Sequence, residues 1–464
     1  MRSERYDLIA IGAGSAARDA AKQAKEEYGA RVALIERERW GGSCPNVACT
    51  PTKAYLVAAD LADAVNNLAG KLGIEVGPAR ANLAKVKARK ETLKKSQSKW
   101  VEDLRAAGFD TYRSTATFTG PDTIAVGEEA VLRADKILIA TGSRTAIPPI
   151  EGLEQVDWLD HVSALELEEL PRSLLVVGAG AVGLEFGQAF ARFGSQVTIV
   201  DTMDQVCPNC DPQAAAELAS ALSAEGIPLL LESLVTRLVR DDGDLIATVA
   251  PRAGGEPQEV RVERVLLASG RLPNIEELAL ERAGVETSRL GIVVDDHLRT
   301  SAPGIWAAGD VTGRYQFTPV AQYEARIAVT DMFRPGEAPA ADYSVLPTAV
   351  FTDPELATVG LTEREATERG YDPEAVVQPL KSVRRASYTD AEFGLFKIVF
   401  DRGSRRVLGL HVVAPNASEV VQGLALGLRL GATVDDLAAA HHTFPTIGEG
   451  VKAAAEQARV MVGA

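Results

Sequence analysis

Near its N-terminus the chain carries an apolar segment that runs into a glycine-rich turn: residues 6–17 read YDLIAIGAGSAA. An Ala- and Lys-rich stretch to about Tyr28 follows, and then a second apolar segment that ends at Glu36. This pattern predicts a strand, a turn, a helix and a second strand that ends in an acid. Gly12 permits the tight turn, and Gly14 lets the backbone approach a pyrophosphate held at the helix N-terminus. We therefore expect a dinucleotide site, with Glu36 accepting hydrogen bonds from a ribose.

The same plan occurs a second time. An apolar segment at 173–177 leads into the turn 178–183, which reads GAGAVG, and a further apolar segment ends at Asp201. The acid follows the first glycine by 24 residues in the first copy and by 23 in the second. Two copies with matching spacing are far more specific than a lone glycine motif. Two dinucleotide sites on one chain imply two nucleotides brought together for electron transfer.

Each copy ends in a similar way, and a different module follows. Residues 136–142 (KILIATG) and 264–270 (RVLLASG) are apolar segments that stop at a small-residue turn. From about Tyr343 the pattern changes to strands near 393–400 and 406–413, followed by helical segments, without a glycine-rich phosphate loop. We therefore predict an α/β fold with two Rossmann-like dinucleotide-binding domains and a C-terminal α+β dimerisation domain.

Composition excludes several classes of function. The chain has 464 residues and a formal net charge of −15, from 49 basic and 64 acidic residues. This balance, without a long basic run, disfavours nucleic acids and anionic membrane surfaces as partners. No apolar run approaches the ~18 residues of a membrane helix. The basic-then-apolar start runs directly into the glycine turn, so we expect no signal peptide and a cytoplasmic protein.

The four cysteines fall as two close pairs, and the first lies in residues 41–53, GGSCPNVACTPTK. In an ideal helix the Cα atoms of Cys44 and Cys49 would lie about 8–9 Å apart, whereas a disulfide needs roughly 4.4–6.8 Å. Bridging therefore requires a distorted turn, which Pro45 favours. Cys49 would lie near the start of a helix from about Thr52, where the helix dipole lowers the pKa of a thiol.

The second pair is Cys207-Pro208-Asn209-Cys210, in the loop between Asp201 and a predicted helix. This spacing suits a disulfide or half of a metal site. No nearby His or Cys supplies the two further ligands that zinc needs, so we predict no metal site. Two local thiols or a local disulfide are favoured over a second working redox centre.

Several motifs resemble those of one family. Residues 41–53 are similar to the GGTCxNxGCxPxK segment of the class I pyridine nucleotide–disulfide oxidoreductases, with Ala48 where glycine is usual. That group holds dihydrolipoamide dehydrogenase, glutathione reductase and mercuric reductase. Residues 270–274 (GRLPN) resemble the family GRxPN, and 307–310 (AAGD) its second flavin motif. Positions within 347–363 match the start of its interface domain, so the resemblance covers essentially the whole chain.

The resemblance implies four segments along the chain. These are a first FAD-binding part at 1–150, an NAD-binding domain at 151–272, a second FAD-binding part at 273–342 and a dimerisation domain at 343–464. Family members are homodimers, in which the C-terminal segment of one subunit completes the active site of the other. We therefore expect a homodimer.

The resemblance also implies where the two nucleotides bind. FAD would occupy the first site, with Glu36 on its ribose and Asp310 on its ribityl chain. The other expected FAD contacts are Gly12, Gly14, Ser15, Ala16, Gly42, Ser43, Lys53, Thr141 and Gly142. The expected NAD contacts are Gly178, Gly180, Val182, Gly183, Glu185, Asp201 and Gly270.

The path of the electrons follows from the same resemblance. Cys49 would lie against the flavin as the charge-transfer thiolate, and Cys44 would be the outward interchange thiol. Lys53 would reach flavin N5 and pair with Glu185 of the second glycine motif. A cation at that position favours the reduced, anionic flavin and so makes hydride acceptance easier.

Charge favours NADH over NADPH as the electron donor. Asp201 would accept a hydrogen bond from the 2′-hydroxyl of NADH and repel a 2′-phosphate. No Lys or Arg lies between Asp201 and Arg237 in the sequence. We therefore expect no nearby cation that could neutralise a 2′-phosphate.

The C-terminal segment departs from the family pattern. Disulfide reductases carry an HPTxxE motif, whose histidine is the acid/base of thiol exchange and is oriented by the glutamate. Here residues 441–449 read HHTFPTIGE, so Glu449 aligns while Phe444 replaces the histidine. A phenyl ring moves no proton, and such a base contributes roughly 10²–10⁴-fold. His442 is a candidate replacement base, and an outward or structural histidine is the alternative.

The electron acceptor is therefore left open. Mercuric reductases also lack the histidine, but they carry a C-terminal cysteine pair, and residues 460–464 read VMVGA. We predict an FAD-dependent enzyme that passes hydride from NADH through flavin to Cys44–Cys49 and on to an unidentified acceptor, including a metal ion such as Hg(II). The alternatives are a dihydrolipoamide dehydrogenase-type reductase, a quinone or oxygen reductase, and a non-catalytic redox sensor. Lys53, Glu185 and both thiols argue against the sensor.

Overall fold

The computed structural model describes residues 2–463, and the chain forms two compact units. Each unit is built from three stretches of the sequence. Unit 1 comprises Met1–Thr52, Ala88–Ala146 and Gly270–Ala341, and unit 2 comprises Lys53–Lys87, Ile147–Ser269 and Asp342–Ala464. One copy of the predicted glycine turn therefore lies in each unit.

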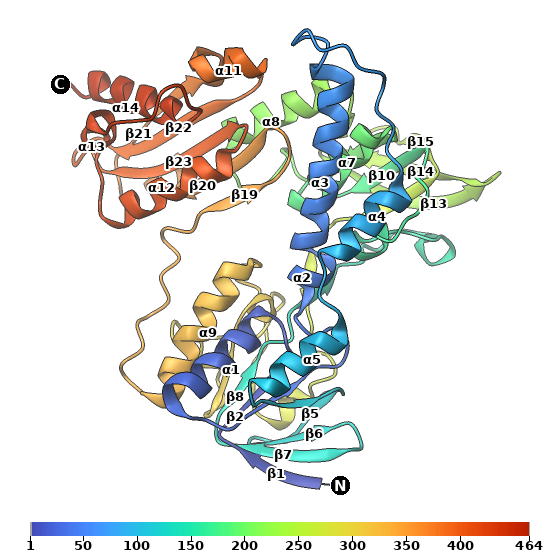
Figure 1. Cartoon of the computed structure of the whole chain (residues 1–464), viewed down its shortest axis with the longest axis vertical. Coiled ribbons are helices and arrows are strands. Elements are labelled where there is room, and N and C mark those ends of the chain that lie inside the picture. The colour runs from blue at the N-terminus through green and yellow to red at the C-terminus, as the bar shows by residue number, and fades with distance from the viewer. Residues whose placement is uncertain (1, 464) are drawn as a thin grey trace. The chain divides into compact units, whose positions relative to one another are not determined.

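A five-stranded parallel sheet forms the centre of unit 1, in the order β18-β8-β2-β3-β4. The segment before the first glycine turn forms β2 (Leu8–Ile11), which is buried throughout, as expected for a strand covered on both faces. Helix α1 (Ser15–Tyr28) lies beside α9 (Thr318–Phe333) in Figure 1, and its buried face consists of alanine, which permits close packing. The other strands are β3 (Val32–Ile35), β4 (Asp110–Tyr112), β8 (Ile137–Ile139) and β18 (Ile305–Ala307).

Smaller elements complete unit 1. A four-stranded sheet has the order β1-β7-β6-β5, and β9 pairs with β17 in an antiparallel ladder. Because of that ladder, residues 271–273 belong to unit 1, although the predicted NAD-binding segment extends to residue 272. The bounds are β1 (Arg2–Tyr6), β5 (Ala116–Gly120), β6 (Thr123–Val126), β7 (Ala130–Ala134), β9 (Ser143–Thr145), β17 (Arg271–Pro273), α2 (Ser43–Val47), α5 (Gln97–Ala106) and two 3-10 segments, Leu280–Arg282 and Asp310–Thr312.

The second glycine turn lies in a four-stranded parallel sheet of unit 2, in the order β12-β11-β10-β16. The strand before the turn is β10 (Ser173–Val177), and the helix after it is α7 (Ala181–Phe193), which is buried over most of its length. Unit 2 also contains a three-stranded antiparallel sheet in the order β13-β14-β15. The remaining bounds are β11 (Gln196–Val200), β12 (Leu229–Leu230), β13 (Ser233–Asp241), β14 (Asp244–Pro251), β15 (Gln258–Val262), β16 (Arg264–Leu267), α6 (His161–Ala164), α8 (Pro212–Ala224) and a 3-10 segment, Leu153–Gln155.

The C-terminal module of unit 2 is a five-stranded antiparallel sheet in the order β19-β20-β23-β22-β21. Every residue of β23 (Val407–Ala414) is buried, and α12 and α14 pack against the sheet (Figure 1). The other bounds are β19 (Thr348–Val350), β20 (Glu355–Gly360), β21 (Pro373–Pro379), β22 (Leu395–Asp401), α10 (Glu363–Glu368), α11 (Arg384–Thr389), α12 (Ala417–Arg429), α13 (Val434–Ala439), α14 (Glu449–Met461) and a 3-10 segment, Leu380–Ser382.

Helix α3 (Cys49–Asp63) carries the second redox cysteine at its start and continues as a π-helical turn, Ala64–Leu68. Helix α4 (Leu83–Thr92) follows after a loop. The predicted architecture of two Rossmann-like parts and a C-terminal α+β domain is confirmed, while the four segment boundaries stay a prediction. Within residues 2–463, no helix is both long and apolar enough to cross a membrane.

Candidate active site

The first glycine turn forms the cradle that the sequence predicts for a pyrophosphate. Gly12 has a φ of +110°, and a Cβ there would overlap the carbonyl of Ala140 at the end of β8. Gly42 has a φ of +77°, and a Cβ there would lie 2.5 Å from the Cα of Gly14. The redox segment and the glycine turn therefore touch through backbone. Helix α1 begins at this point with Gly14 as N-cap, so its first N–H groups receive no side-chain cap.

Glu36 is held at the end of β3 by backbone donors. Its carboxylate accepts hydrogen bonds from the N–H groups of Ala13 (3.0 Å), Glu38 (2.8 Å) and Arg39 (3.0 Å). A cavity of about 230 Å³ lies at this carboxyl end of the parallel strands, where nucleotides bind in such sheets. A glycine cradle, an acid on the rim and a cavity fit the adenosine and pyrophosphate of FAD. The cavity is lined by Ile11, Gly12, Ile35, Glu36, Arg37, Ser114, Thr115, Ala116, Thr141, Arg144, Asn274, Glu276, Glu277 and Leu278.

Asp310, the expected ribityl contact, is held by a relay that the sequence analysis did not assign. Arg271 donates from Nε to Ser143 Oγ (2.8 Å), and Ser143 Oγ donates to Asp310 Oδ2 (2.6 Å). Arg271 Nε lies 3.9 Å from the same Asp310 oxygen. Arg271 belongs to the GRLPN motif, so the sequence could have indicated a role for it. The motif does not reveal that Ser143 lies between Arg271 and Asp310.

Thr141 and Gly142 are also fixed by the GRLPN segment. Thr141 Oγ1 donates to the carbonyl of Asn274 (2.7 Å), and Asn274 Nδ2 donates to the carbonyl of Thr141 (3.0 Å). The N–H of Asn274 donates to Gly142 O (2.9 Å). Gly270, which we expected to contact NAD, lies in unit 1 and accepts a hydrogen bond from Ala146 N (2.9 Å). Its nucleotide contact stays a prediction.

The two redox thiols meet at a break between helices. Ala48, with φ −128° and ψ −101°, separates α2 from α3, so the distorted turn predicted for this pair is present. The negative φ explains why alanine is accepted where the family has glycine. A hydrogen bond from the Cys49 thiol is the main cause that lowers the pKa of Cys44 to about 6, and Thr318 and Arg18 act in the same direction against burial. In the structure the lowered pKa thus falls on Cys44, whereas the sequence analysis expected it for Cys49; the role of Cys49 as charge-transfer thiolate stays a prediction.

Lys53 and Glu185 form the predicted ion pair, with Lys53 Nζ 2.6 Å from Glu185 Oε2. The Glu185 side chain is 6% exposed, and its other oxygen accepts the N–H of Phe351 (3.0 Å). The Phe351 ring centroid lies 4.4 Å from Lys53 Nζ, so the aromatic face also stabilises the cation. Glu185 is placed by the close fit of Gly183, where a Cβ would overlap the carbonyl of Gly178. Phe351 had no predicted role.

Asp201 sits against the second glycine turn in the same way as Glu36 against the first. Its carboxylate accepts the N–H groups of Ala179 (2.5 Å) and Met203 (2.8 Å). The expectation that no cation lies near this acid is wrong. Arg252, which follows β14, donates from Nη1 to the carbonyl of Thr202 (2.8 Å). The antiparallel sheet brings it there from far along the chain, so sequence spacing could not reveal it.

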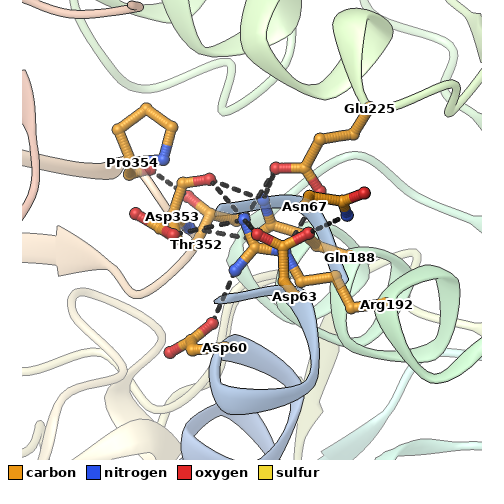
Figure 2. Close-up of polar contacts among 9 residues, drawn as sticks. All are labelled: Asp60, Asp63, Asn67, Gln188, Arg192, Glu225, Thr352, Asp353 and Pro354. Atoms are coloured by element: carbon orange, nitrogen blue, oxygen red, sulfur yellow. Dashed lines mark hydrogen bonds and ion pairs between the residues drawn. The ribbon is translucent and has the colours of Figure 1, made fainter. Parts of the chain in front are cut away.

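A buried arginine links α3 and α7, the helices on which Lys53 and Glu185 lie, by an ion pair (Figure 2). The side chain of Arg192 on α7 is 4% exposed and pairs with Asp60 of α3 (2.7 Å), Glu225 (2.7 Å) and Asp353 (3.2 Å). Gln188 donates to the carbonyl of Asp353 (2.7 Å) from the same helix. Burial is the main cause that raises the pKa of Asp60 to about 6, against the lowering effect of Arg192. These three carboxylates thus share Arg192 as their counter-ion.

The C-terminal segment presents Phe444 at the surface of its module, with 69% of the residue exposed. His441 is exposed and His442 is half-buried. Glu449 begins α14, and its carboxylate accepts the N–H of Thr446 (3.1 Å). The structure gives no contact that joins His442 to this carboxylate, so a role for His442 as replacement base stays a prediction.

Comparison with known proteins agrees with these features. A family model described as pyridine nucleotide-disulphide oxidoreductase matches residues 6–325, and one for the dimerisation domain of the same family matches residues 346–455. The chain belongs to the pyridine nucleotide-disulphide oxidoreductases. The match confirms the predicted enzyme class, with binding of FAD and a pyridine nucleotide.

Relatives of this oxidoreductase include enzymes with different acceptors. A mercuric reductase of Staphylococcus aureus is 36% identical over 97% of this chain and 82% of its own length. Dihydrolipoyl dehydrogenase 3 of Pseudomonas putida is 34% identical over 97% of both chains. Among solved structures, the Cu(II) complex of the HOCl-induced flavoprotein disulfide reductase RclA from Escherichia coli superposes with a TM-score of 0.86 at 29% identity, over 98% of this chain and 99% of that one.

The dimerisation-domain match also supports the expected homodimer of this oxidoreductase. Large apolar side chains stand exposed on the C-terminal module, as a surface that is covered in an assembly would require. They include Leu426 (63% exposed), Leu430 (78%), Phe444 (69%) and Val460 (77%).

The pKa of Cys44 predicts the pH dependence of its alkylation. A thiolate is the nucleophile, and a pKa of about 6 makes most of Cys44 a thiolate at pH 7. In the reduced enzyme, iodoacetamide should label Cys44 with a rate that rises from pH 5 and levels off above about pH 7, as followed by peptide mass spectrometry. A Cys49→Ala variant lacks the donor that lowers this pKa and should show a higher midpoint. A Cys44 midpoint near the ordinary thiol value in the unmodified enzyme would contradict this interpretation.

Proposed function

We propose that this oxidoreductase uses NADH to reduce a thiophilic metal ion through Cys44 and Cys49, with Hg(II) as the test case. The net reaction is NADH + Hg²⁺ → NAD⁺ + Hg⁰ + H⁺. The observation that carries this proposal is Phe444 at the position of the family's acid/base. Reduction of a dithiol-type substrate needs a proton for each departing thiolate, whereas a soft metal ion passes between thiolates without one.

The residues on the electron path each have a task that their contacts support. FAD, when bound, accepts a hydride and delivers an electron pair. Lys53 supplies positive charge, which Glu185 and the Phe351 ring hold in place. Cys44 supplies a thiolate near neutral pH, and Cys49 donates a hydrogen bond to it. A thiolate beside a thiol that gives up its proton on metal binding is a good ligand set for a soft cation.

Two of the comparisons support a metal ion as acceptor. The mercuric reductases share 36% identity with this chain over nearly its whole length. The Escherichia coli flavoprotein RclA has been solved as a Cu(II) complex. A disulfide substrate is the second candidate, because a dihydrolipoyl dehydrogenase is 34% identical over the same length. We further propose the cytoplasm as the compartment, where thiols are kept reduced.

An acceptor screen tests the proposal. Anaerobic NADH oxidation by the purified holoenzyme should be fast with Hg(II) buffered by a small thiol and slow with lipoamide or a quinone. Cys44→Ser should lose Hg(II) turnover while its flavin is still bleached by NADH, because hydride transfer to flavin does not require this thiol. Cys210→Ser, which removes a thiol outside the pair, is the matched control and should keep turnover. Faster turnover with lipoamide than with Hg(II) would overturn the proposal.

We also propose NADH as the electron donor, because the Asp201 carboxylate would repel a 2′-phosphate. Asp201→Ala should raise kcat/KM with NADPH about tenfold, a change of about 1.4 kcal/mol. Arg252 is held next to this acid through Thr202 and is the cation that could then bind the phosphate. The gain should therefore disappear in the Asp201→Ala/Arg252→Ala double variant. A preference for NADPH in the unmodified enzyme would exclude this assignment.

A further inference from the structure

The second cysteine pair has the geometry of a bridgeable dithiol. The N–H of Cys210 donates to the carbonyl of Cys207 (2.8 Å), which closes a four-residue turn over Pro208 and Asn209. Such a turn places its first and fourth Cα atoms within about 7 Å, and a disulfide needs roughly 4.4–6.8 Å. The Cys207 thiol already donates a hydrogen bond to the Cys210 sulfur. The two sulfurs can therefore join with little movement of the backbone.

The two thiols are unequal in the way that redox-active pairs are. Cys207 is 5% exposed, whereas Cys210 is partly exposed. The hydrogen bond between them raises the pKa of Cys207, as do burial and the carboxylates of Glu185 and Asp201, and it lowers the pKa of Cys210. A reachable thiolate beside a buried thiol suits oxidation in two steps: the first sulfur attacks an oxidant and the second resolves the product.

The pair lies directly against the second glycine turn. The N–H of Cys207 donates to the carbonyl of Ala179 in that turn (2.9 Å). On the other side, Asp211 follows Cys210, caps α8, and pairs with the buried Lys397 (2.7 Å) of β22. The Cys210 end is thus clamped by a buried ion pair, whereas the Cys207 end is attached to the glycine turn by a backbone hydrogen bond. The small backbone adjustment that disulfide formation requires therefore falls on the Cys207 end and is passed to the glycine turn.

We infer that Cys207 and Cys210 form a second redox-active dithiol, oxidised by hydroperoxides, whose disulfide weakens pyridine nucleotide binding at the adjacent glycine turn. In the first step Cys210–S⁻ + H₂O₂ + H⁺ → Cys210–SOH + H₂O. In the second, Cys207–SH + HOS–Cys210 → Cys207–S–S–Cys210 + H₂O. The two sulfurs together lose two electrons, which the O–O bond accepts. This inference rests on the proposed function in one respect: it takes the pyridine nucleotide to bind at the second glycine turn.

Peptide mass spectrometry and calorimetry test the two parts of the inference separately. The reduced holoenzyme is treated with hydrogen peroxide, and the peptide that holds both cysteines should lose two hydrogens. Titration with NAD⁺, which does not reduce the flavin, should then show a dissociation constant about tenfold higher, restored by dithiothreitol. Cys210→Ser and Cys207→Ala should bind NAD⁺ with the affinity of the reduced unmodified protein, both without peroxide and after treatment with it.

Each contrary result has a distinct meaning. Failure to form the Cys207–Cys210 disulfide would overturn the redox assignment. A disulfide that leaves NAD⁺ binding unchanged would overturn the control of the nucleotide site, as would an equal response to peroxide in Cys210→Ser. If the reduced protein did not bind NAD⁺ at all, the nucleotide site of the proposed function would be refuted, and the control inferred from it as well, while the mass spectrum would still report on the dithiol.

Discussion

Phe444→His is expected to raise kcat/KM for lipoamide by about 10²–10⁴-fold, the contribution of a positioned acid/base. Phe444 occupies the position of the histidine in the family motif, and the proline, threonine and glutamate around it are retained. The carboxylate of Glu449, three residues after Thr446, remains available to orient an imidazole once the dimer is formed. The introduced imidazole would protonate the departing thiolate, whereas the phenyl ring of Phe444 has no proton to transfer.

Steady-state NADH oxidation with lipoamide measures this gain. Phe444→Gln is the matched control, because it has a polar side chain that does not titrate and should not raise turnover. Turnover with Hg(II) should change little, since that reaction needs no proton from this position. Two results would contradict the interpretation: rapid lipoamide turnover by the unmodified enzyme that is lost in His442→Ala, which would make His442 the base, or no gain in Phe444→His.

The parts of the site that the sequence predicted are those built from local backbone geometry. Gly12 and Gly178 indicate tight turns in the sequence, because only glycine accepts a positive φ so close to a neighbouring carbonyl. The acids Glu36 and Asp201 follow at a fixed distance because one strand, one helix and one further strand separate them from the turn. These relations are contained in one continuous stretch of chain.

The parts that the sequence did not predict depend on contacts between distant segments. Arg252 reaches the turn after Asp201 only because an antiparallel sheet folds back there. Ser143 enters the relay to Asp310 only because β9 pairs with β17. Phe351 contacts Lys53 from the start of the C-terminal module. No spacing rule connects these positions, so they become visible only when the tertiary structure is known.

Arg192→Met is expected to lower the free energy of unfolding by about 2–3 kcal/mol, less than for a fully buried pair because the acids left behind are partly exposed to water. Methionine keeps much of the length and packing of arginine, so the loss reports on charge. It would leave Glu225, Asp353 and Asp60 without the cation that they share. Urea denaturation measures the effect. The exposed Arg237, paired with Glu151, provides the control, and Arg237→Met should change stability by less than about 1 kcal/mol.

The destabilisation of Arg192→Met should also depend on pH, in a direction set by Asp60. Its folded-state pKa of about 6 lies above the ordinary value of 3.8. A carboxyl whose pKa is raised by folding binds a proton more tightly in the folded state, so it favours folding as the pH falls through that window. Removing Arg192 removes an effect that lowers this pKa, and the protonated acid becomes more favourable still. The variant should therefore recover part of its lost stability between pH 7 and pH 5. A loss that is constant over this range, or that grows toward pH 5, would show that the acids around Arg192 do not carry the cost.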